Sequence, residues 1–297
     1  APLFSTLIMT AVPAQVAGVD RITLASPPGP DGLPHETVLA TAHELGISEV
    51  WAIGGAQAIA ALALGTGSVR PVDKIVGPGN RFVMMAKQQL FGTVGIESLP
   101  GPTETLVLAD ASADPEHVIA DLLAQAEHSG AVPVLVTDSA ALLDQVQTGL
   151  PVALADLPTA EVARESLTER GTAVLVPDLQ AGMAVANDFA PEHLCLLVAE
   201  PEALIDQVRN AGGIFVGHST MEALGDYIAG PSHVMPTGRT ARFASFVNVR
   251  DFQKVIPVLQ SSSGLTASIG PAAVKMARAE GLEAHARAIL SRTGNGG

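Results

Sequence analysis

The sequence is poor in cysteine, in aromatic residues and in positive charge. Its single cysteine, Cys195, cannot form an internal disulfide, and a zinc site built from several cysteines is excluded. A lone cysteine is typical of a protein kept in a reducing compartment, so we expect a cytoplasmic location. Only 3% of the residues are aromatic, while Ala, Val, Leu and Gly are abundant. This composition favours helices that pack closely on a buried parallel sheet.

Basic residues are outnumbered, since 16 Lys and Arg stand against 30 Asp and Glu and give a formal net charge of −14. Nucleic-acid binding depends on neutralising phosphates, so we expect no nucleic-acid partner. No apolar run has the length of a membrane span and no signal-peptide pattern opens the sequence, so no membrane partner is expected. The sequence begins at Ala1 without a methionine and enters a helical pattern at once. We therefore expect it to be part of a longer protein.

Short apolar runs rich in Val, Ile and Leu recur along the chain, and most precede a turn signal and a helical pattern. This alternation predicts an α/β fold with two domains of mostly parallel sheets flanked by helices, an incomplete Rossmann-like arrangement. The predicted strands cover residues 21–25, 49–53, 74–76, 105–109, 132–136, 173–176, 194–198 and 213–216, and the clearest helices cover 56–64, about ten residues ending at 90, 115–128 and 271–291.

Two features divide the chain into predicted segments. Pro100-Gly101-Pro102 breaks any regular element, and the strand rhythm stops near Phe246. We therefore predict one α/β domain over residues 1–102 and a second over 103–246. A helical C-terminal segment is predicted over 247–297.

Gln125 and His128 end the predicted helix 115–128 and are three residues apart, so they share a helix face. An amide oxygen and an imidazole on one face can both bind a metal. The alternative is an exposed histidine at a helix end, where a positive charge is favourable.

Glu192 and His193 precede the predicted strand 194–198. A histidine with a pKa near ~6.5 can take a proton at neutral pH, and a neighbouring carboxylate can activate water. The alternative is a turn with two solvated side chains. Both residues can serve one reacting carbon only if they lie in a turn, because adjacent strand residues face opposite ways.

The segment 225–233 places Asp226, the only tyrosine and His233 between glycines, which suits a functional loop. Cys195 lies inside an apolar run, so we expect buried, unreactive packing. The turns at 54–57 and 77–80 follow strands and precede helices, where backbone N–H groups can hold phosphate, although neither has the dinucleotide fingerprint. Glu280 and His285 are five apart on the predicted last helix and do not share a face.

Taken together, these segments resemble the histidinol dehydrogenase family. The resemblance covers nearly the whole chain and keeps the family's order of motifs, at residues 1–18, 54–63, 72–80, 101–104, 120–128, 190–194, 224–237 and 280–288. It implies an NAD-dependent oxidation of L-histidinol to L-histidine through the aldehyde, in histidine biosynthesis. The domain over 1–102 would bind NAD, and that over 103–246 zinc and substrate.

The resemblance also implies roles for individual residues. His193 matches the general base and Glu192 the residue that activates water. Zn²⁺, one per subunit, would be held by a set without thiolates, which suits a catalytic site. By the same resemblance the metal ligands are Gln125, His128, Asp226 and His285, the further substrate contacts are Thr103, His233 and Glu280, and the NAD contacts are Gln57 and Asn80.

Two departures and one further implication accompany the resemblance. The family usually has Ser at the position of Thr103 and Asn at that of Ser232. The family also carries an N-terminal segment ahead of the position of Ala1 and forms homodimers. In these the C-terminal segment reaches the partner's active site, so Glu280 and His285 would serve a neighbouring subunit. Two alternatives stay open at this point, a zinc hydrolase that uses Glu192 and a folded chain without catalytic activity.

Overall fold

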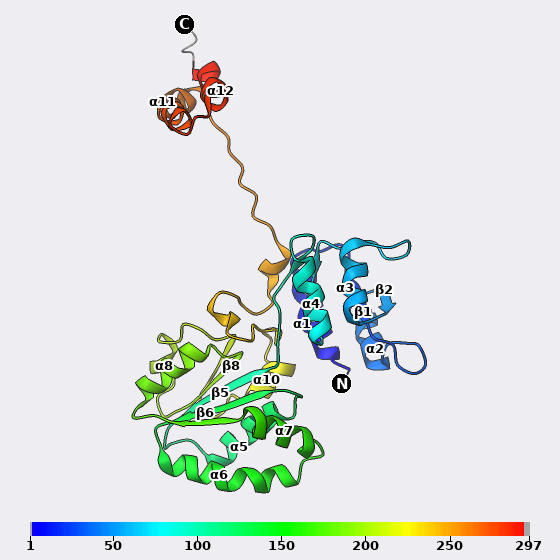
Figure 1. Ribbon diagram of the computed structural model, residues 1–297, viewed down its shortest axis with the longest axis vertical. Coiled ribbons are helices and arrows are strands. Elements are labelled where there is room, and N and C mark those ends of the chain that lie inside the picture. The colour runs from blue at the N-terminus through cyan, green and yellow to red at the C-terminus, as the bar shows by residue number, and fades with distance from the viewer. Residues whose placement is uncertain (1, 294–297) are drawn as a thin grey trace. The chain divides into compact units, whose positions relative to one another are not determined.

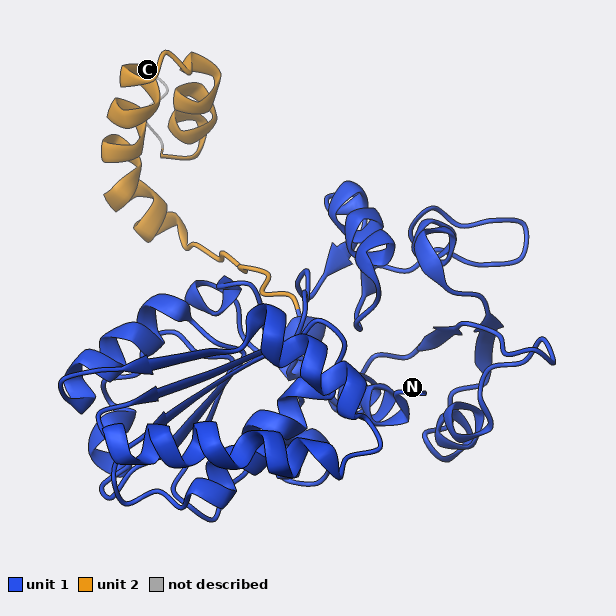
Figure 2. Cartoon of the chain, turned by 60° about the horizontal axis from the view of Figure 1, so that its bottom comes forward, with its two compact units in different colours: residues 1–253 blue, residues 254–297 orange. Residues whose placement is uncertain are grey.

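The computed structural model describes residues 2–293, and it divides into two compact units, residues 1–253 and residues 254–297 (Figure 2). The larger unit contains every strand of the described chain, and the smaller one contains two helices. No helix within residues 2–293 combines the length and the apolar character needed to cross a bilayer.

A sheet of five parallel strands forms the centre of the larger unit, in the order β7-β6-β5-β8-β9 (Figure 1). Strand order reverses between β5 and β8, as in doubly wound sheets. Thr105 pairs with His193 in this register, so the starts of β5 and β8 lie side by side. The strands are β5 (Glu104–Ala109), β6 (Val132–Thr137), β7 (Thr172–Leu175), β8 (His193–Leu197) and β9 (Gly213–Val216).

Helices cover both faces of this sheet, because successive strand residues point to opposite faces. Val107 and Cys195 face the layer formed by α5 (Pro115–Ala126), α6 (Ala140–Ala155) and α7 (Ala160–Arg170). Leu106 and Leu194 face the opposite layer, to which α8 (Leu179–Phe189) contributes. All four strand side chains are fully buried. Two short helices, α9 (Glu202–Ile205) and α10 (Glu222–Tyr227), flank β9 in the sequence.

The N-terminal part of this unit contains two small parallel sheets, β1–β2 and β3–β4. Their apolar side chains form separate clusters with the neighbouring helices. In chain order the elements are α1 (Phe4–Val16), β1 (Thr23–Ser26), α2 (Glu36–Glu44), β2 (Glu49–Ala52), α3 (Gly55–Leu64), β3 (Lys74–Ile75), α4 (Arg81–Leu90) and β4 (Gly95–Ile96).

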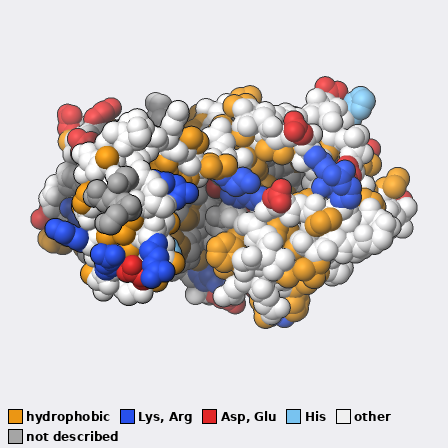
Figure 3. Space-filling view, turned by 90° about the horizontal axis from the view of Figure 1, so that it is seen from above, with side chains coloured by type: hydrophobic (Ala, Val, Ile, Leu, Met, Phe, Trp, Pro, Cys, Tyr) orange, Lys and Arg blue, Asp and Glu red, His pale blue; other side chains and the backbone are white. Residues whose placement is uncertain are grey.

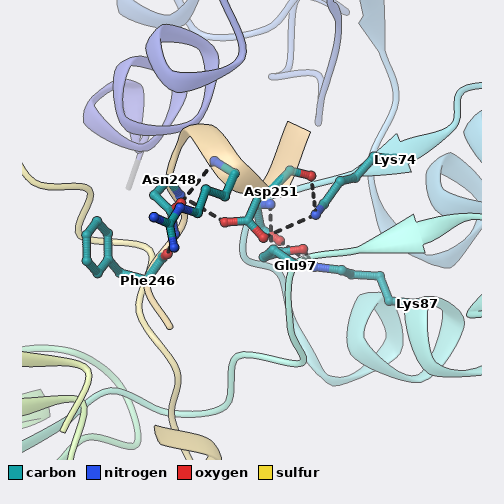
Figure 4. Close-up of polar contacts among 8 residues, drawn as sticks. Lys74, Lys87, Glu97, Phe246, Asn248 and Asp251 are labelled. Carbon is teal, nitrogen blue, oxygen red and sulfur yellow. Dashed lines mark hydrogen bonds and ion pairs between the residues drawn. The ribbon is translucent and has the colours of Figure 1, made fainter. Parts of the chain in front are cut away.

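A buried ion pair fastens the loop between β3 and α4. Lys87 Nζ lies 2.8 Å from Glu97 Oε1, and the two side chains are 0% and 3% exposed (Figure 4). Glu97 also accepts a hydrogen bond from the backbone N–H of Gly77, and Lys87 donates to the carbonyl of Gly77. The pair therefore holds both backbone polar groups of Gly77. Nearby, Lys74 bonds to Asp251 and ties β3 to the 3₁₀ helix η2 (Val249–Phe252).

The smaller unit corrects the prediction of one helix over residues 271–291. Two helices are present, α11 (Ser263–Ala279) and α12 (Glu283–Thr293). Gly281 separates them with a φ of +77°, and Leu282 N–H bonds back to Ala277 O, which are the signs of a glycine-terminated helix end. Pro271, the first residue of the predicted helix, lies inside α11.

All eight predicted strands are present within a residue or two of the expected bounds, which confirms the α/β class with parallel sheets. The two-residue strand β4 was not predicted. The predicted division between residues 1–102 and 103–246 stays a prediction. On the face drawn in Figure 3, Lys and Arg side chains stand in separate groups, several of them beside Asp and Glu side chains.

Candidate active site

The candidate residues of the larger unit gather at the amino edge of the five-stranded sheet. Thr103 directly precedes β5, and Glu192 and His193 stand at the start of the adjacent β8. The helix α5 runs back from the carboxyl edge, so its last turn brings Gln125 to the same place. Ligands of α/β proteins usually bind at the carboxyl edge, so this site occupies the opposite one.

Glu192 is held by the segment that enters β5. Its Oε2 accepts hydrogen bonds from Thr103 Oγ1 at 2.6 Å and from the backbone N–H of Glu104 at 3.2 Å. Burial raises the pKa of Glu192 to about 8, against the effect of the Thr103 hydrogen bond. Ala190, in the left-handed conformation with φ +54°, turns the chain from α8 toward this position. Glu192 thus lies in a bend, while His193 already belongs to β8, and neither side chain has the solvation that the alternative interpretation expects.

His193 is the first residue of β8 and is only 4% exposed. Its Nδ1 faces oxygen atoms, with Glu222 Oε2 at 3.9 Å and Glu192 Oε2 at 4.0 Å. Its Nε2 is buried and has no hydrogen-bond partner. Burial lowers the pKa of His193 to about 4, although the charge of Asp226 acts in the opposite direction. The imidazole is therefore neutral at pH 7 and has a free nitrogen.

Gln125 is joined to two residues that sequence reasoning missed, Thr105 and Glu222. Thr105 Oγ1 lies 2.8 Å from Gln125 Oε1 and also bonds to the carboxylate of Glu222. Glu222 is 2% exposed, and burial raises its pKa to about 8. One signal could have indicated Glu222, because it lies one helical turn before Asp226. No pattern in the sequence indicated Thr105 as a site residue, since it lies inside an apolar strand.

Asp226 and His233 form a second part of the cluster. His233 Nδ1 bonds to the carbonyl oxygen of Asp226 at 2.8 Å, and its Nε2 lies 2.9 Å from the hydroxyl of Thr6 on α1. The charge of Asp226 acts on both Glu192 and His193, which places all three in one electrostatic neighbourhood. Asp226 and His233 of the segment 225–233 therefore lie near His193, and their roles in the site stay predictions.

His128 lies near the same cluster but not on the helix predicted for it. The helix α5 ends at Ala126, and His128 follows the cap residue Glu127 with an exposed side chain. The charge of His128 nevertheless contributes to the lowered pKa of His193. The prediction that His128 ends a helix is wrong by two residues, because the chain turns at Ser129-Gly130, where Gly130 has a φ of +80°.

The chemistry of this cluster fits a divalent cation. In the part of the chain that the structure describes, no Lys or Arg forms an ion pair with Glu192, Glu222 or Asp226. Among buried side-chain atoms of residues 2–293 the unpartnered ones are Gln125 Nε2, His193 Nε2 and Glu104 Oε2, all from this region. A buried carboxyl oxygen or imidazole nitrogen without a partner can bind a positive ion, and Gln125 can do so only if its amide presents Oε1 instead of Nε2.

The predicted zinc ligands are only partly assembled. Within residues 2–293, no three His, Cys, Asp or Glu side chains stand in a metal-binding group. The predicted set contains an amide, Gln125, and a histidine of the smaller unit, His285. Glu280 and His285 both lie in residues 254–297, where Glu280 caps α11 and His285 is exposed on α12. Their roles stay predictions.

The two Gly-rich turns lie at helix starts, as expected. Gly54 caps α3, and Gln57 is exposed in its first turn. Asn80 caps α4, and its Oδ1 accepts from the backbone N–H groups of Phe82 and Val83. These donors are therefore satisfied within the chain, and the Nδ2 of Asn80 is the atom left for a ligand. NAD contacts at Gln57 and Asn80 stay predictions.

Cys195 is fully buried in β8, and burial raises the pKa of its thiol well above the usual value. A thiol that does not ionise is a poor nucleophile. Burial of Cys195 is confirmed, and its position between the two helical layers gives it a packing role.

Comparisons with known proteins point to one family. The histidinol dehydrogenase family model matches residues 1–293. The chain is 60% identical to histidinol dehydrogenase of Deinococcus radiodurans over 294 residues, which covers 98% of this chain and 67% of the relative. It is 55% identical to the Thermus thermophilus enzyme, covering 97% of this chain and 69% of that protein.

A solved structure agrees with the sequence comparisons. The crystal structure of histidinol dehydrogenase from Elizabethkingia anophelis has a TM-score of 0.96 and 38% identity, covering 99% of this chain and 68% of that one. The chain thus spans about two thirds of the length of these relatives. The family match leaves no support for a zinc hydrolase, and this chain belongs to the histidinol dehydrogenase family.

Proposed function

We propose that this chain oxidises L-histidinol to L-histidine through the aldehyde, using NAD and one zinc ion, as a cytoplasmic enzyme of histidine biosynthesis. The observation that carries the proposal is the buried imidazole of His193, whose Nε2 has no partner and whose Nδ1 lies 4.0 Å from the buried carboxyl of Glu192. Both steps of this oxidation need a base near one carbon. The substrate, L-histidinol, is assigned from membership of the family.

His193 would accept the hydroxyl proton of the alcohol at Nε2 as hydride leaves the neighbouring carbon. Its low pKa keeps this nitrogen unprotonated at neutral pH, and the Nδ1 side faces oxygen atoms that orient the ring. NAD, when bound, accepts the hydride. Gln57 and Asn80 would contact the cofactor at the starts of α3 and α4.

Glu192 would activate the water that attacks the aldehyde. Its Oε2 is fixed by Thr103 and by a backbone N–H, so its second oxygen, Oε1, is free to accept a proton from water. The Thr103 hydroxyl performs the role for which the family uses serine. Because the pKa of Glu192 is about 8, this base becomes fully effective at mildly alkaline pH.

The zinc ligands would be Gln125, His128, Asp226 and His285. The substrate would contact these residues and also Thr103, His233 and Glu280. Zinc, when bound, supplies a positive charge that holds the substrate's imidazole and amino nitrogens. The unpartnered Nε2 of His193 and the acidic side chains of this edge, which have no Lys or Arg partner within residues 2–293, support that assignment. His233 would be oriented by its bond to the Asp226 backbone.

We further propose a homodimer in which Glu280 and His285 of a second copy of the chain complete each site. The segment between η2 and α11 supports this idea, because its apolar side chains are almost wholly exposed. Val255 is 99% exposed and Leu259 is 90% exposed. Apolar residues exposed in a row are typical of an interface with another chain.

The test follows NADH formation from L-histidinol and NAD, with zinc and with a chelator. It uses this 297-residue chain and a chimera in which the chain replaces the matched two thirds of the Deinococcus relative. We expect two NADH per histidinol and loss of activity with chelator that added zinc restores. A chimera that forms no NADH would reject the dehydrogenase, and NADH formation unaffected by chelation would reject zinc. Activity in the chimera alone would show the 297-residue chain to be a non-catalytic portion.

A further inference from the structure

Thr105 lies at the centre of a buried group of polar side chains that the proposed reaction does not use directly. Its Oγ1 contacts Gln125 Oε1 at 2.8 Å, His193 Nδ1 at 3.5 Å and a carboxylate oxygen of Glu222. Thr105 is 0% exposed, and none of its three partners exceeds 4%. Water therefore cannot supply missing hydrogen bonds here, and the four side chains must satisfy one another.

The number of hydrogen atoms in this group determines which side chain donates to which. A hydroxyl has one hydrogen, so Thr105 can donate to Glu222 or to Gln125 Oε1, but not to both. With Oε1 toward Thr105, the Nε2 of Gln125 has no partner. A half turn of the amide exchanges O and N in the same space and removes both conflicts. Gln125 Nε2 then donates to Thr105, and Thr105 donates to the Glu222 carboxylate.

The same arrangement accommodates His193. The oxygen of Thr105 has two lone pairs, so it can accept from Gln125 Nε2 and from an N–H at Nδ1 of His193. With its hydrogen at Nδ1, the imidazole presents a bare Nε2, which is the buried nitrogen without a partner. A neighbouring carboxylate commonly fixes the tautomer of a working histidine in this way.

We propose that Glu222 and Thr105 are positioning residues, which orient the Gln125 amide with its Oε1 toward the cation site and hold His193 in the tautomer with a free Nε2. The proposal rests on the proposed function. In its ionised form Glu222 anchors the chain, because a carboxylate accepts a stronger hydrogen bond than a neutral group does. One acidic side chain on α10 thereby orders two functional side chains that come from α5 and β8 (Figure 1).

A purely structural role is the competing interpretation. A buried carboxylate without a Lys or Arg partner is a costly way to fill a core, and an apolar side chain of similar size would be more stabilising. Within residues 2–293 no Lys or Arg pairs with Glu222, and the nearest basic side chain is His193, whose imidazole is neutral at pH 7. Placement beside the proposed base and a proposed metal ligand therefore favours a functional reason for keeping this carboxylate.

The test compares Thr105→Val, which removes the hydroxyl at almost constant volume, with Thr105→Ser, which keeps it. Glu222→Leu and Glu222→Gln form the second pair, since only the glutamine keeps an acceptor oxygen. Thr137→Val is the matched control, because Thr137 is an equally buried threonine on the neighbouring strand β6 and its hydroxyl bonds only to the backbone of Ser139. Each protein is examined for zinc affinity by chelator competition, for thermal unfolding without metal, and for kcat and KM.

We expect Thr105→Val and Glu222→Leu to weaken zinc binding by ~10–100-fold, as outer-shell changes do, and to lower kcat. The serine and glutamine variants should recover most of both. Thr137→Val should change unfolding alone. If Thr105→Val has the same zinc affinity and the same kcat as the wild type, the proposal is overturned, even if the variant unfolds at a lower temperature.

A second readout does not need metal. The ¹⁵N shifts of the metal-free protein, assigned with His193→Asn, should report the Nδ1–H tautomer of His193, and Glu222→Leu should shift the population toward Nε2–H. An unchanged tautomer would contradict the role of Glu222. Failure of the proposed function would instead appear in the wild type, as absent zinc binding or absent NADH, so the two failures are distinguishable.

Discussion

His193 and Glu192 are neighbours in the sequence, and burial moves their pKa values in opposite directions. The imidazole is kept neutral and the carboxyl is kept protonated up to about pH 8. Groups whose pKa values are separated by their surroundings can divide acid and base work between them. We therefore expect the two residues to serve different halves of the oxidation.

That division predicts different defects in two variants. His193→Asn should lower the rate of alcohol oxidation by ~10²–10⁴-fold, since it removes the base for that proton. Glu192→Gln should lower the rate of aldehyde oxidation by a similar factor and allow the first NADH to form. Rapid-mixing measurements of NADH with histidinol, and separately with the aldehyde, check both rates.

His43→Asn provides the control, because His43 is exposed on α2 and belongs to no polar cluster of the site. It should leave both rates unchanged. Equal losses in both half-reactions for both variants would contradict separate roles.

Glu192 also predicts how stability depends on pH. Its pKa is about 8 in the folded chain and 4.5 without the fold, so folding favours the protonated form. This contribution is fully present below pH 4.5 and is lost as the pH rises to 8. Between these limits the free energy of unfolding should fall by up to ~1.4 kcal/mol per pH unit more in the wild type than in Glu192→Gln.

Urea unfolding of the metal-free proteins from pH 5 to 8 measures the difference between the two. Asp121 also has a raised pKa and titrates in both proteins, whereas the raised pKa of Glu222 depends in part on the charge of Glu192, so the comparison measures Glu192 together with this coupling. Parallel pH profiles for the wild type and the variant would contradict a raised pKa at Glu192.

Whole elements were easier to predict from the sequence than the residues of the site. Apolar runs such as 105–109 and 132–136 identify buried strands, because a strand covered on both faces needs apolar side chains throughout. The strand β4 is two residues long and has too little pattern to detect. The break at Gly281 was missed because Ala-rich helical composition continues on both sides of it.

The site could be predicted only where a family motif marked it. Glu192, His193 and Asp226 belong to motifs. In the structure they lie close enough for the charge of Asp226 to act on the pKa values of Glu192 and His193. Thr105 and Glu222 are 117 residues apart, and nothing in the local sequence joins them. Their contact depends on the sheet order and on α10 packing beside α5, which are properties of the tertiary fold.

At the scale of one element, the loop before α4 depends on the Lys87–Glu97 pair. Glu97→Gln leaves a fully buried ammonium without its counter-ion and should lower the free energy of unfolding by ~3–5 kcal/mol. Because Glu97 also holds the N–H of Gly77, the KM for NAD should rise if Asn80 contacts the cofactor. Urea unfolding and NAD titration measure the two effects.

The control is Glu49→Gln, which removes the partner of Arg21 in a pair whose side chains are 29% and 25% exposed. Solvent screens such a pair, so the change should cost less than ~1 kcal/mol. Equal losses for the two variants would show that burial does not set the strength of the Lys87 pair.

At the scale of the whole molecule, the second unit, residues 254–297, carries two predicted site residues, Glu280 and His285. If a second copy supplies His285, a mixture of His193→Asn and His285→Asn chains should regain activity that neither variant has. Each mixed dimer would contain one intact site, so random pairing gives about a quarter of the wild-type rate. NADH formation after co-refolding in the chimera measures it.

The same mixture would give a different result if His285 acted within its own chain. If each chain supplies its own His285, every site in every dimer carries one substitution, and the mixed sample stays as inactive as its components. The wild-type chimera refolded alongside provides the reference rate.

The amino-edge position of the site has a consequence for which molecules it accepts. In a parallel sheet the connecting helices end at that edge, as α5, α7 and α8 do here before β6, β7 and β8. Helix C-termini carry partial negative charge, which adds to the field of the local carboxylates. Such a field attracts an amine and repels phosphate, so a phosphate ester of the same amino alcohol should bind far more weakly than the free alcohol does.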